Sequence, residues 1–201
     1  MRELAILTFV TLDGVMQAPH DAEEDPTNGF TAGGWALGCW DEVMTQVERE
    51  AMAAPYDLLL GRATYDSFAE AFSASGATGN DRMTNAVKYV ATSDPDTLSW
   101  QNTIPLTGDI AAEIVKLKLQ NGPLLQVHGS WELVQTLIAN DLVDEYRLWT
   151  FPVLVGHGKR LFQHLDAQLE LTLRKAGRAG GSGATMAIYR RTATRDTSIA
   201  Y

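Results

Sequence analysis

Cysteine is almost absent from this chain, which has 201 residues and a single cysteine, Cys39. One thiol cannot form an internal disulfide, and it cannot supply the ligands of a cysteine-rich zinc site. The four histidines are scattered, and no Ser/His/Asp or Cys/His arrangement with catalytic spacing is found in the sequence. We therefore predict a cytoplasmic protein without a metal site.

Basic residues are also scarce, with 16 Lys and Arg against 25 Asp and Glu and a net charge of -9. Nucleic acid and anionic membrane surfaces would not attract such a chain. No apolar run is long enough to cross a bilayer, and the N-terminus lacks a signal-peptide layout. We expect a small-molecule ligand, no nucleic acid and no membrane. Any phosphate must then be held locally, by backbone amides and a few Arg or Lys side chains.

What the sequence does contain is an alternation of short apolar runs and helical spacing. Strands are predicted over residues 4–10, 58–60, 88–92, 124–127 and 143–154, and helices over 39–54, 64–72, 110–119 and 130–139. Residues 168–175 and 185–191 predict a closing antiparallel hairpin. This order predicts an α/β fold with a central mixed, mainly parallel sheet and helices on both faces. We expect one domain over residues 1–191 and a flexible tail over 192–201.

Three segments are predicted to be loops. Residues 16–38 are rich in Pro, Gly, Asp and Glu, and a loop of that length in a compact domain is usually functional or disordered. Trp35 and Trp40 near its end favour the functional interpretation. Residues 73–81 form a second loop, rich in Gly, Ser and Ala. Residues 177–183 connect the predicted hairpin.

Two strand-to-helix transitions carry the functional prediction. In the first, a strand ends at Gly61-Arg62 and Thr64 opens a helix, so free N–H groups and a guanidinium could hold a phosphate. In the second, Gly129 would let the backbone approach a pyrophosphate, and Ser130 would cap the next helix or donate to the anion. The alternatives are a tight turn with a surface arginine and an ordinary capped turn.

Candidates for a proton source are the carboxyl groups of Asp13, Asp41 and Glu42. A carboxyl group in an apolar cleft can have a raised pKa and donate a proton. Asp41 and Glu42 open a predicted helix, where acids are favoured by the dipole alone, and Asp13-Gly14 could be only a turn. We favour Asp41 as the proton source, with Asp13 second.

Several motifs in a specific order resemble the reductase domain of riboflavin biosynthesis, which shares the dihydrofolate reductase fold. They are Thr11-Leu12-Asp13-Gly14, Leu60-Gly61-Arg62-Ala63-Thr64-Tyr65, Val127-His128-Gly129-Ser130, the segment 142–148 and the segment 152–162. Each motif is weak singly, and together they cover the chain to about residue 191. The resemblance implies NADPH as hydride donor and a homodimer.

The resemblance also implies positions for the cofactor and the substrate. The adenosine phosphates would lie near Gly61, Arg62 and Thr64, the adenine ribose near Thr92 and Ser93, and the pyrophosphate near Gly129, Ser130, Trp131 and Glu132. The nicotinamide would lie near the turn at residues 11–15, with Thr11, Gly14 and Trp40 close to the substrate.

We therefore expect an NADPH-dependent reductase that transfers hydride to a small heterocyclic, imine or ribosyl-type acceptor. It would be similar to 5-amino-6-(5-phosphoribosylamino)uracil reductase. The chain lacks the zinc-binding motifs of the deaminase that accompanies that reductase in the bifunctional enzyme. The acids Asp21, Glu23, Glu24 and Asp25 would repel a phosphorylated sugar. A non-catalytic nucleotide-binding module or a dihydrofolate reductase proper are the alternatives.

Overall fold

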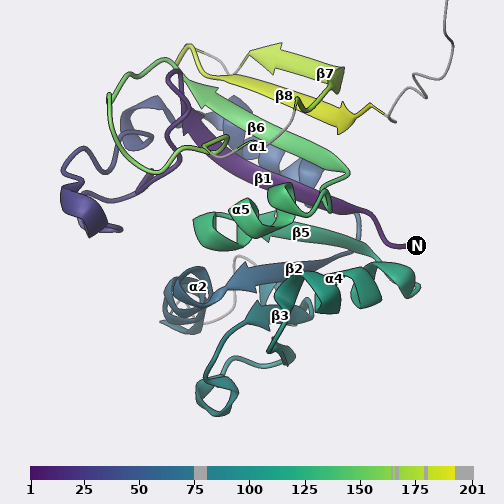
Figure 1. The fold of residues 1–201 in the computed structure, drawn as a ribbon. Coiled ribbons are helices and arrows are strands. Elements are labelled where there is room, and N and C mark those ends of the chain that lie inside the picture. Colours follow the sequence, from purple (N-terminus) through teal and green to yellow (C-terminus); the bar gives the residue numbers. More distant parts are fainter. Residues whose placement is uncertain (75–80, 164, 166–167, 179–180, 193–201) are drawn as a thin grey trace, which may run out of the picture.

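The computed structural model describes residues 1–74, 81–163, 165, 168–178 and 181–192. These residues build an eight-stranded sheet with the strand order β4-β3-β2-β5-β1-β6-β8-β7 (Figure 1). The strands are β1 (Leu4–Thr11), β2 (Tyr56–Gly61), β3 (Lys88–Ala91), β4 (Thr103–Leu106), β5 (Leu124–His128), β6 (Glu145–Phe151), β7 (Leu171–Arg178) and β8 (Thr185–Arg191). All neighbours from β4 to β6 are parallel, and β8 is antiparallel to β6 and β7. The predicted mixed, mainly parallel sheet with a C-terminal hairpin is confirmed.

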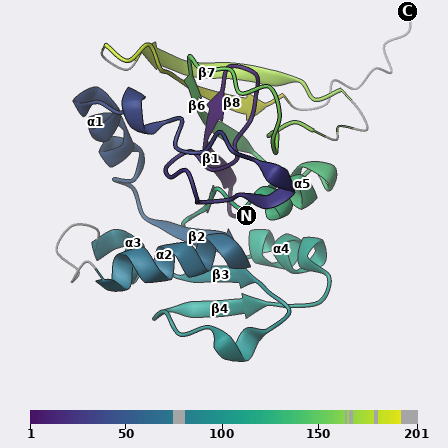
Figure 2. The same cartoon turned by 90° about the vertical axis from the view of Figure 1, so that its left-hand side faces the viewer.

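Five helices of the described residues pack on the sheet. They are α1 (Glu42–Ala51), α2 (Arg62–Ala74), α3 (Asp81–Asn85), α4 (Ile110–Leu119) and α5 (Trp131–Ala139). Figure 2 shows α1 on one side of the sheet and α4 and α5 on the other. The prediction of helices on both faces is therefore confirmed.

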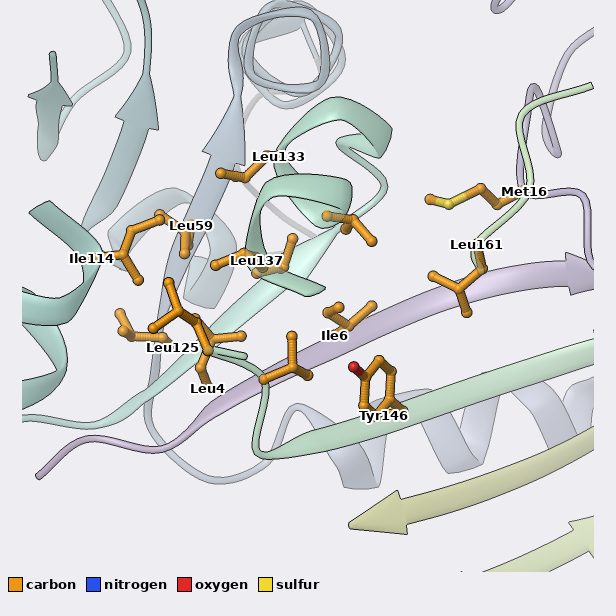
Figure 3. Packing of buried hydrophobic residues seen from close by; sticks show 14 of the residues in the cluster. Leu4, Ile6, Met16, Leu59, Ile114, Leu125, Leu133, Leu137, Tyr146 and Leu161 are labelled. Atoms are coloured by element: carbon orange, nitrogen blue, oxygen red, sulfur yellow. The ribbon is translucent and has the colours of Figure 1, made fainter. Parts of the chain in front are cut away.

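The central strand β1 shows why the sheet is buried on both faces. All eight of its residues are buried, as its nearly continuous apolar run predicts. Because strand side chains alternate, Leu4 and Ile6 pack with α4 and α5 in one cluster, while Phe9 packs on the opposite face. Figure 3 shows the first cluster, in which Leu133 and Leu137 of α5 lie over these strands.

The opposite face carries two further apolar clusters. One joins Met44 of α1 to Phe9, Trp149 and Phe151, and includes Trp35 of the long loop. The other joins α2 and α3 to β2 and β3, with the buried side chains of Met52, Tyr56, Leu58, Leu60, Tyr65, Met83, Val90 and Trp100. Helices α1 and α2 thus both lie over this face of the sheet, in separate clusters.

Two elements, β4 and α3, are absent from the predicted set. The strand Thr103–Leu106 contains Pro105, which cannot donate to a ladder, and the structure places it at the sheet edge, where proline is tolerated. Helix α3 has five residues, too few to show a helical period.

Some predicted boundaries are corrected as well. The helix predicted over 39–54 begins at Glu42, because Leu37–Cys39 form a 3-10 turn and Asp41 is the N-cap. Three residues of the loop predicted over 73–81 are helical instead, since Ser73 and Ala74 belong to α2 and Asp81 opens α3. Residues 75–80, 179–180 and 193–201 lie outside the described residues, and so does nearly all of the predicted tail.

No helix within the described ranges has both the length and the apolar character required to cross a bilayer.

Candidate functional site

The two strand-to-helix transitions predicted from the sequence meet in the structure. Strands β2 and β5 are parallel neighbours, so helices α2 and α5 begin side by side at one edge of the sheet. The backbone N–H of Gly61 donates to the Ser130 hydroxyl at 2.9 Å, and the N–H of Ser130 donates to the Thr64 hydroxyl at 3.0 Å. Each helix start is therefore held by a side chain of the other.

The residues before α5 adopt an unusual backbone. Gly129 has φ +53°, and Ser130 has φ 55° and ψ 54°, so two successive residues are left-handed. The prediction that Ser130 caps α5 is wrong, because its hydroxyl makes no capping hydrogen bond and instead donates to the His128 carbonyl at 3.1 Å. The left-handed pair turns the chain sharply, and the absence of a side chain at Gly129 leaves the backbone open to a ligand.

A cavity of about 820 Å³ opens above these helix starts. Its lining combines both helix starts with the long loop, α1 and α2. The lining residues include Gly61, Arg62, Thr64, Gly129, Ser130, Trp131 and Glu132 from the predicted cofactor site, and Trp40 from the predicted substrate site. The structure thus brings most of the predicted binding residues together around one cavity.

Arg62 stands at the rim of the cavity and is anchored on two sides. Its Nε donates to Asp66 at 2.8 Å, and its terminal nitrogen donates to the Thr97 hydroxyl at 2.6 Å. The same nitrogen reaches the Asp94 carbonyl at 3.3 Å. These contacts join α2 to the segment after β3 and fix where the positive charge lies.

Thr92 and Ser93 lie outside the cavity lining, at the end of β3. The Thr92 hydroxyl accepts from the backbone N–H of Asp94 at 3.0 Å, and so shapes the turn whose carbonyl receives Arg62. The structure therefore places Thr92 and Ser93 beside Arg62 at the rim of the cavity, and not among the residues that line the cavity. Their predicted contact with the adenine ribose stays a prediction.

The long loop over residues 16–38 forms one wall of the cavity, and the side chain of Gln17 holds parts of it together by hydrogen bonds. This side chain is 3% exposed, and its amide donates to the carbonyls of Asp25 and Thr27 at 3.0 and 3.1 Å. Its oxygen accepts from the backbone N–H of Lys159 at 3.0 Å, and the Lys159 ammonium pairs with Asp25 at 2.7 Å. The functional interpretation of this loop agrees with its position along the cavity.

The predicted turn at residues 11–15 is held by hydrogen bonds within itself and to the segment after β6. The Thr11 hydroxyl donates to the Asp13 carboxylate at 2.6 Å, and that carboxylate also accepts from the backbone N–H of Gly156 at 2.8 Å. The Thr11 hydrogen bond and the amides of residues 155–156 lower the pKa of Asp13, so the group is ionised near neutral pH. Thr11, Asp13 and Gly14 are not among the cavity-lining residues.

Asp41, the favoured proton source, serves as the N-cap of α1. One carboxylate oxygen accepts from the backbone N–H of Met44 at 2.9 Å, which is the ordinary role of an acid at that position. Its other oxygen is buried without a hydrogen bond among the described residues. Asp41 is not part of the cavity lining, although Trp40 next to it is. The catalytic roles of Asp41 and Asp13 remain predictions.

Among the described residues, the acids that line the cavity are Glu24, Asp25, Glu48 and Glu132, and the sequence analysis overlooked Glu48. Burial raises the pKa of its carboxyl group, and the positive potential of His20 opposes the shift. A signal for Glu48 was present in the sequence, because it is four residues from both Met44 and Met52. Residues at that spacing share one helix face, and both methionines are buried.

Further lining residues missed by the sequence analysis come from elements far apart in the chain. They are Phe9, His20, Phe68, Phe72, Met83, His128 and Lys159, among others. Phe9 contacts the rings of His20 and Trp40 with centroids 5.2 and 5.6 Å apart. His128 and Lys159 lie inside two of the motifs quoted above. Phe9, His20, Phe68, Phe72 and Met83 come from β1, the long loop, α2 and α3, and only tertiary packing brings them together, so no local motif marks them.

Residues 2–183 match the model of the family described as RibD C-terminal domain. The chain belongs to the RibD C-terminal domain family.

Two proteins similar in sequence are both described as uncharacterised, so neither description names an activity. This RibD C-terminal domain is 25% identical over 198 residues to the uncharacterised protein YyaP of Bacillus subtilis (strain 168), covering 94% of each chain. It is 29% identical over 86 residues to the uncharacterised protein YwjB of the same organism, covering 43% of this chain and 49% of that one.

Solved structures show the same fold. A Shewanella sp. PV-4 protein provisionally assigned to riboflavin biosynthesis aligns with a TM-score of 0.66 and 20% identity, covering 96% of this chain and 100% of that chain. Dihydrofolate reductase from Enterococcus faecalis, complexed with NADP(H) and RAB-propyl, aligns with a TM-score of 0.60 and 16% identity, covering 95% and 97%. The family and the fold together indicate a reductase-type oxidoreductase.

Proposed function

We propose that this RibD C-terminal domain is an NADPH-dependent reductase of a small unsaturated acceptor. One observation carries the proposal: the starts of α2 and α5 are interlocked through Gly61, Thr64 and Ser130 beside a cavity of about 820 Å³. Two helix N-termini aimed at one place offer free N–H groups and positive dipole ends to a diphosphate.

The residues at these helix starts fit a dinucleotide. Gly129 lacks a side chain at a left-handed position, so a pyrophosphate can approach the backbone there. Arg62 places a guanidinium at the rim on the side of β3, where an adenosine phosphate could reach it. The bound coenzyme would supply the hydride, and the protein would supply position and a dry cavity.

The acceptor would lie at the far side of the cavity, between the long loop, α1 and α2. There Phe9, Trp40 and Phe68 provide apolar walls, and Glu48 provides a carboxyl group. The protein's contribution is to hold the acceptor against the hydride donor and to exclude water.

Fluorescence titration with NADPH tests the proposal, with Arg62→Ala as the first variant. We expect the wild-type protein to bind NADPH and the variant to bind it about tenfold more weakly, because a charge-assisted hydrogen bond contributes roughly 1.5–3 kcal/mol. Arg174→Ala, at an exposed position on β7, should bind as the wild type does. A screen of imines and heterocycles for oxidation of NADPH follows. Binding without any turnover would favour a non-catalytic module, and no binding would contradict the proposal.

A further inference from the structure

The floor of the cavity carries a buried histidine, His128, at the end of β5. Its partner in the sheet register is Leu7 of β1, and Leu7 pairs in turn with Arg147 of β6. Residues in register on neighbouring parallel strands lie on the same face of the sheet. Leu7 and His128 both line the cavity, and His128 is only 7% exposed. Its side chain therefore lies under the cavity, on the face of the sheet that carries α1 and α2.

Neighbouring side chains hold the His128 ring in one orientation. Gln126 lies two residues earlier on β5, so it is on the same face, and it is 1% exposed. Its amide oxygen is 3.1 Å from Nε2 of His128. Phe68 of α2 packs edge-on against the ring, with the centroids 6.2 Å apart. Because an amide oxygen can only accept a hydrogen bond, Nε2 carries the proton of the ring.

The His128 ring is neutral near pH 7. Burial lowers the pKa of His128 to about 4, and the positive charge of Arg147 contributes to the shift. A neutral imidazole with its proton on Nε2 has a lone pair on Nδ1, which can accept a hydrogen bond. His128 can therefore receive a donor from a ligand at Nδ1, and it has no proton there to give.

The Nδ1 atom has no partner within the described part of the chain, where the one hydrogen bond of the ring is made by Nε2. Fully buried side-chain atoms without a hydrogen bond are, among the described residues, Oδ2 of Asp41 and the hydroxyl of Tyr56. Nδ1 of His128 is not one of these atoms, so it keeps accessible surface, and the space that His128 lines is the cavity. An acceptor in such a place is costly to leave unpaired, and a ligand that donates to it removes the cost.

We infer that His128 is a specificity-determining residue, whose Nδ1 accepts a hydrogen bond from a ring N–H or amino group of the molecule that is reduced. This inference rests on the proposed function and names the chemical class of the ligand. The ligand is a flat ring, because Phe9 and Phe68 line the cavity together with His128. The donor edge needs no positive charge, because the imidazole is neutral. A ring edge with only ether or carbonyl oxygens meets a lone pair at Nδ1 and is disfavoured.

Two matched probes test this inference on the wild-type protein, without coenzyme and with saturating NADPH. Indole has a ring N–H, and benzofuran has nearly the same shape with an oxygen in place of that group. Neither probe is charged. We expect NMR titration to show that indole binds about tenfold more tightly than benzofuran, because benzofuran leaves Nδ1 of His128 unpaired.

Three variants show whether His128 is responsible for the preference. His128→Phe keeps a flat ring without its nitrogens and should reduce the preference for indole to about twofold or less. His128→Asn places an amide oxygen close to the position of Nδ1 and should keep a preference of at least about fourfold. His157→Phe makes the same change at an exposed histidine outside the cavity lining, and it should bind both probes as the wild type does.

The ring nitrogens of the wild-type protein give a second measurement that needs no variant. In protein labelled with nitrogen-15, Nδ1 of His128 should give the signal of an unprotonated nitrogen and should shift more with indole than with benzofuran. Equal binding of the two probes, binding of neither, a preference that survives in His128→Phe, or a proton on Nδ1 would each overturn the inference. Absence of NADPH binding with the indole preference intact would overturn only the proposed function.

Discussion

Asp57→Asn should lower the free energy of unfolding by about 3–5 kcal/mol, the largest stability effect we expect from one substitution. Asp57 at the start of β2 pairs with Arg2, whose side chain is 2% exposed. The substitution removes the negative partner and leaves a guanidinium buried without its counter-charge. Urea unfolding followed by circular dichroism measures the loss.

The effect is large because Arg2 joins three neighbouring strands. Its Nε donates to the carbonyl of Pro123, just before β5, and its backbone N–H donates to the backbone carbonyl of Lys118 at 2.7 Å. The guanidinium also lies over the Tyr89 ring of β3, 5.5 Å from the centroid. The pair thus fixes the amino ends of the central strands, and the candidate site is built at their carboxyl ends.

Two further variants make this prediction specific. The double variant Arg2→Met, Asp57→Leu removes both charges and should recover most of the stability, because apolar side chains can replace a buried ion pair at little cost. Glu113→Gln breaks the exposed pair with Lys116 and should change stability by less than about 1 kcal/mol. An equal loss in Asp57→Asn and Glu113→Gln would contradict the account.

Acidification should destabilise the protein through His128 by about 3 kcal/mol between pH 6.5 and pH 4. Burial, with a smaller contribution from the Arg147 charge, lowers the pKa of His128 from its ordinary 6.5 to about 4 in the folded chain. The unfolded chain binds a proton below pH 6.5 while the folded chain does not, so stability is full above pH 6.5 and falls as the pH drops toward 4. Each pH unit with a one-proton difference changes stability by about 1.4 kcal/mol.

The contribution of His128 is isolated by comparison with His128→Gln. Carboxyl groups titrate in the same range, so the unfolding free energy is measured from pH 7.5 to pH 4 for both proteins and subtracted. The difference should be flat above pH 6.5 and should then shift steadily in favour of the variant. A difference that stays constant over the whole range would show that His128 does not titrate on unfolding.

Much of the fold could be predicted because its signals are local. The continuous apolar run of β1, the spacing of α4 and the Gly-Arg boundary between β2 and α2 each show in a few consecutive residues. The elements that were missed lack such signals. Strand β4 is short and contains Pro105, and its position at the sheet edge depends on β3 rather than on its own sequence.

The residues of the candidate site also fall into two groups, those with a local sequence signal and those without one. Gly61, Arg62, Gly129 and Ser130 were found because a strand meets a helix there, and their contact follows from the pairing of β2 with β5. Glu48 was missed because an acid on an amphipathic helix ordinarily faces solvent. Its place in the cavity depends on where the fold puts α1 relative to α2, and the sequence of α1 alone does not show that.

Ser130 shows a third outcome, in which the residue was identified but its role was wrong. Serine before a helix predicts a cap, yet the left-handed backbone at Gly129 and Ser130 turns the hydroxyl toward Gly61 and His128. The chain thereby gains a link between two helix starts. That link depends on a neighbouring strand, which a local pattern cannot show.

A crystal structure of the protein grown with NADPH tests the central claim most directly. The account predicts a pyrophosphate within hydrogen-bonding distance of the backbone N–H groups at the starts of α2 and α5, with the nicotinamide directed toward Glu48. Coenzyme bound at another surface, or crystals without coenzyme at millimolar NADPH, would contradict it.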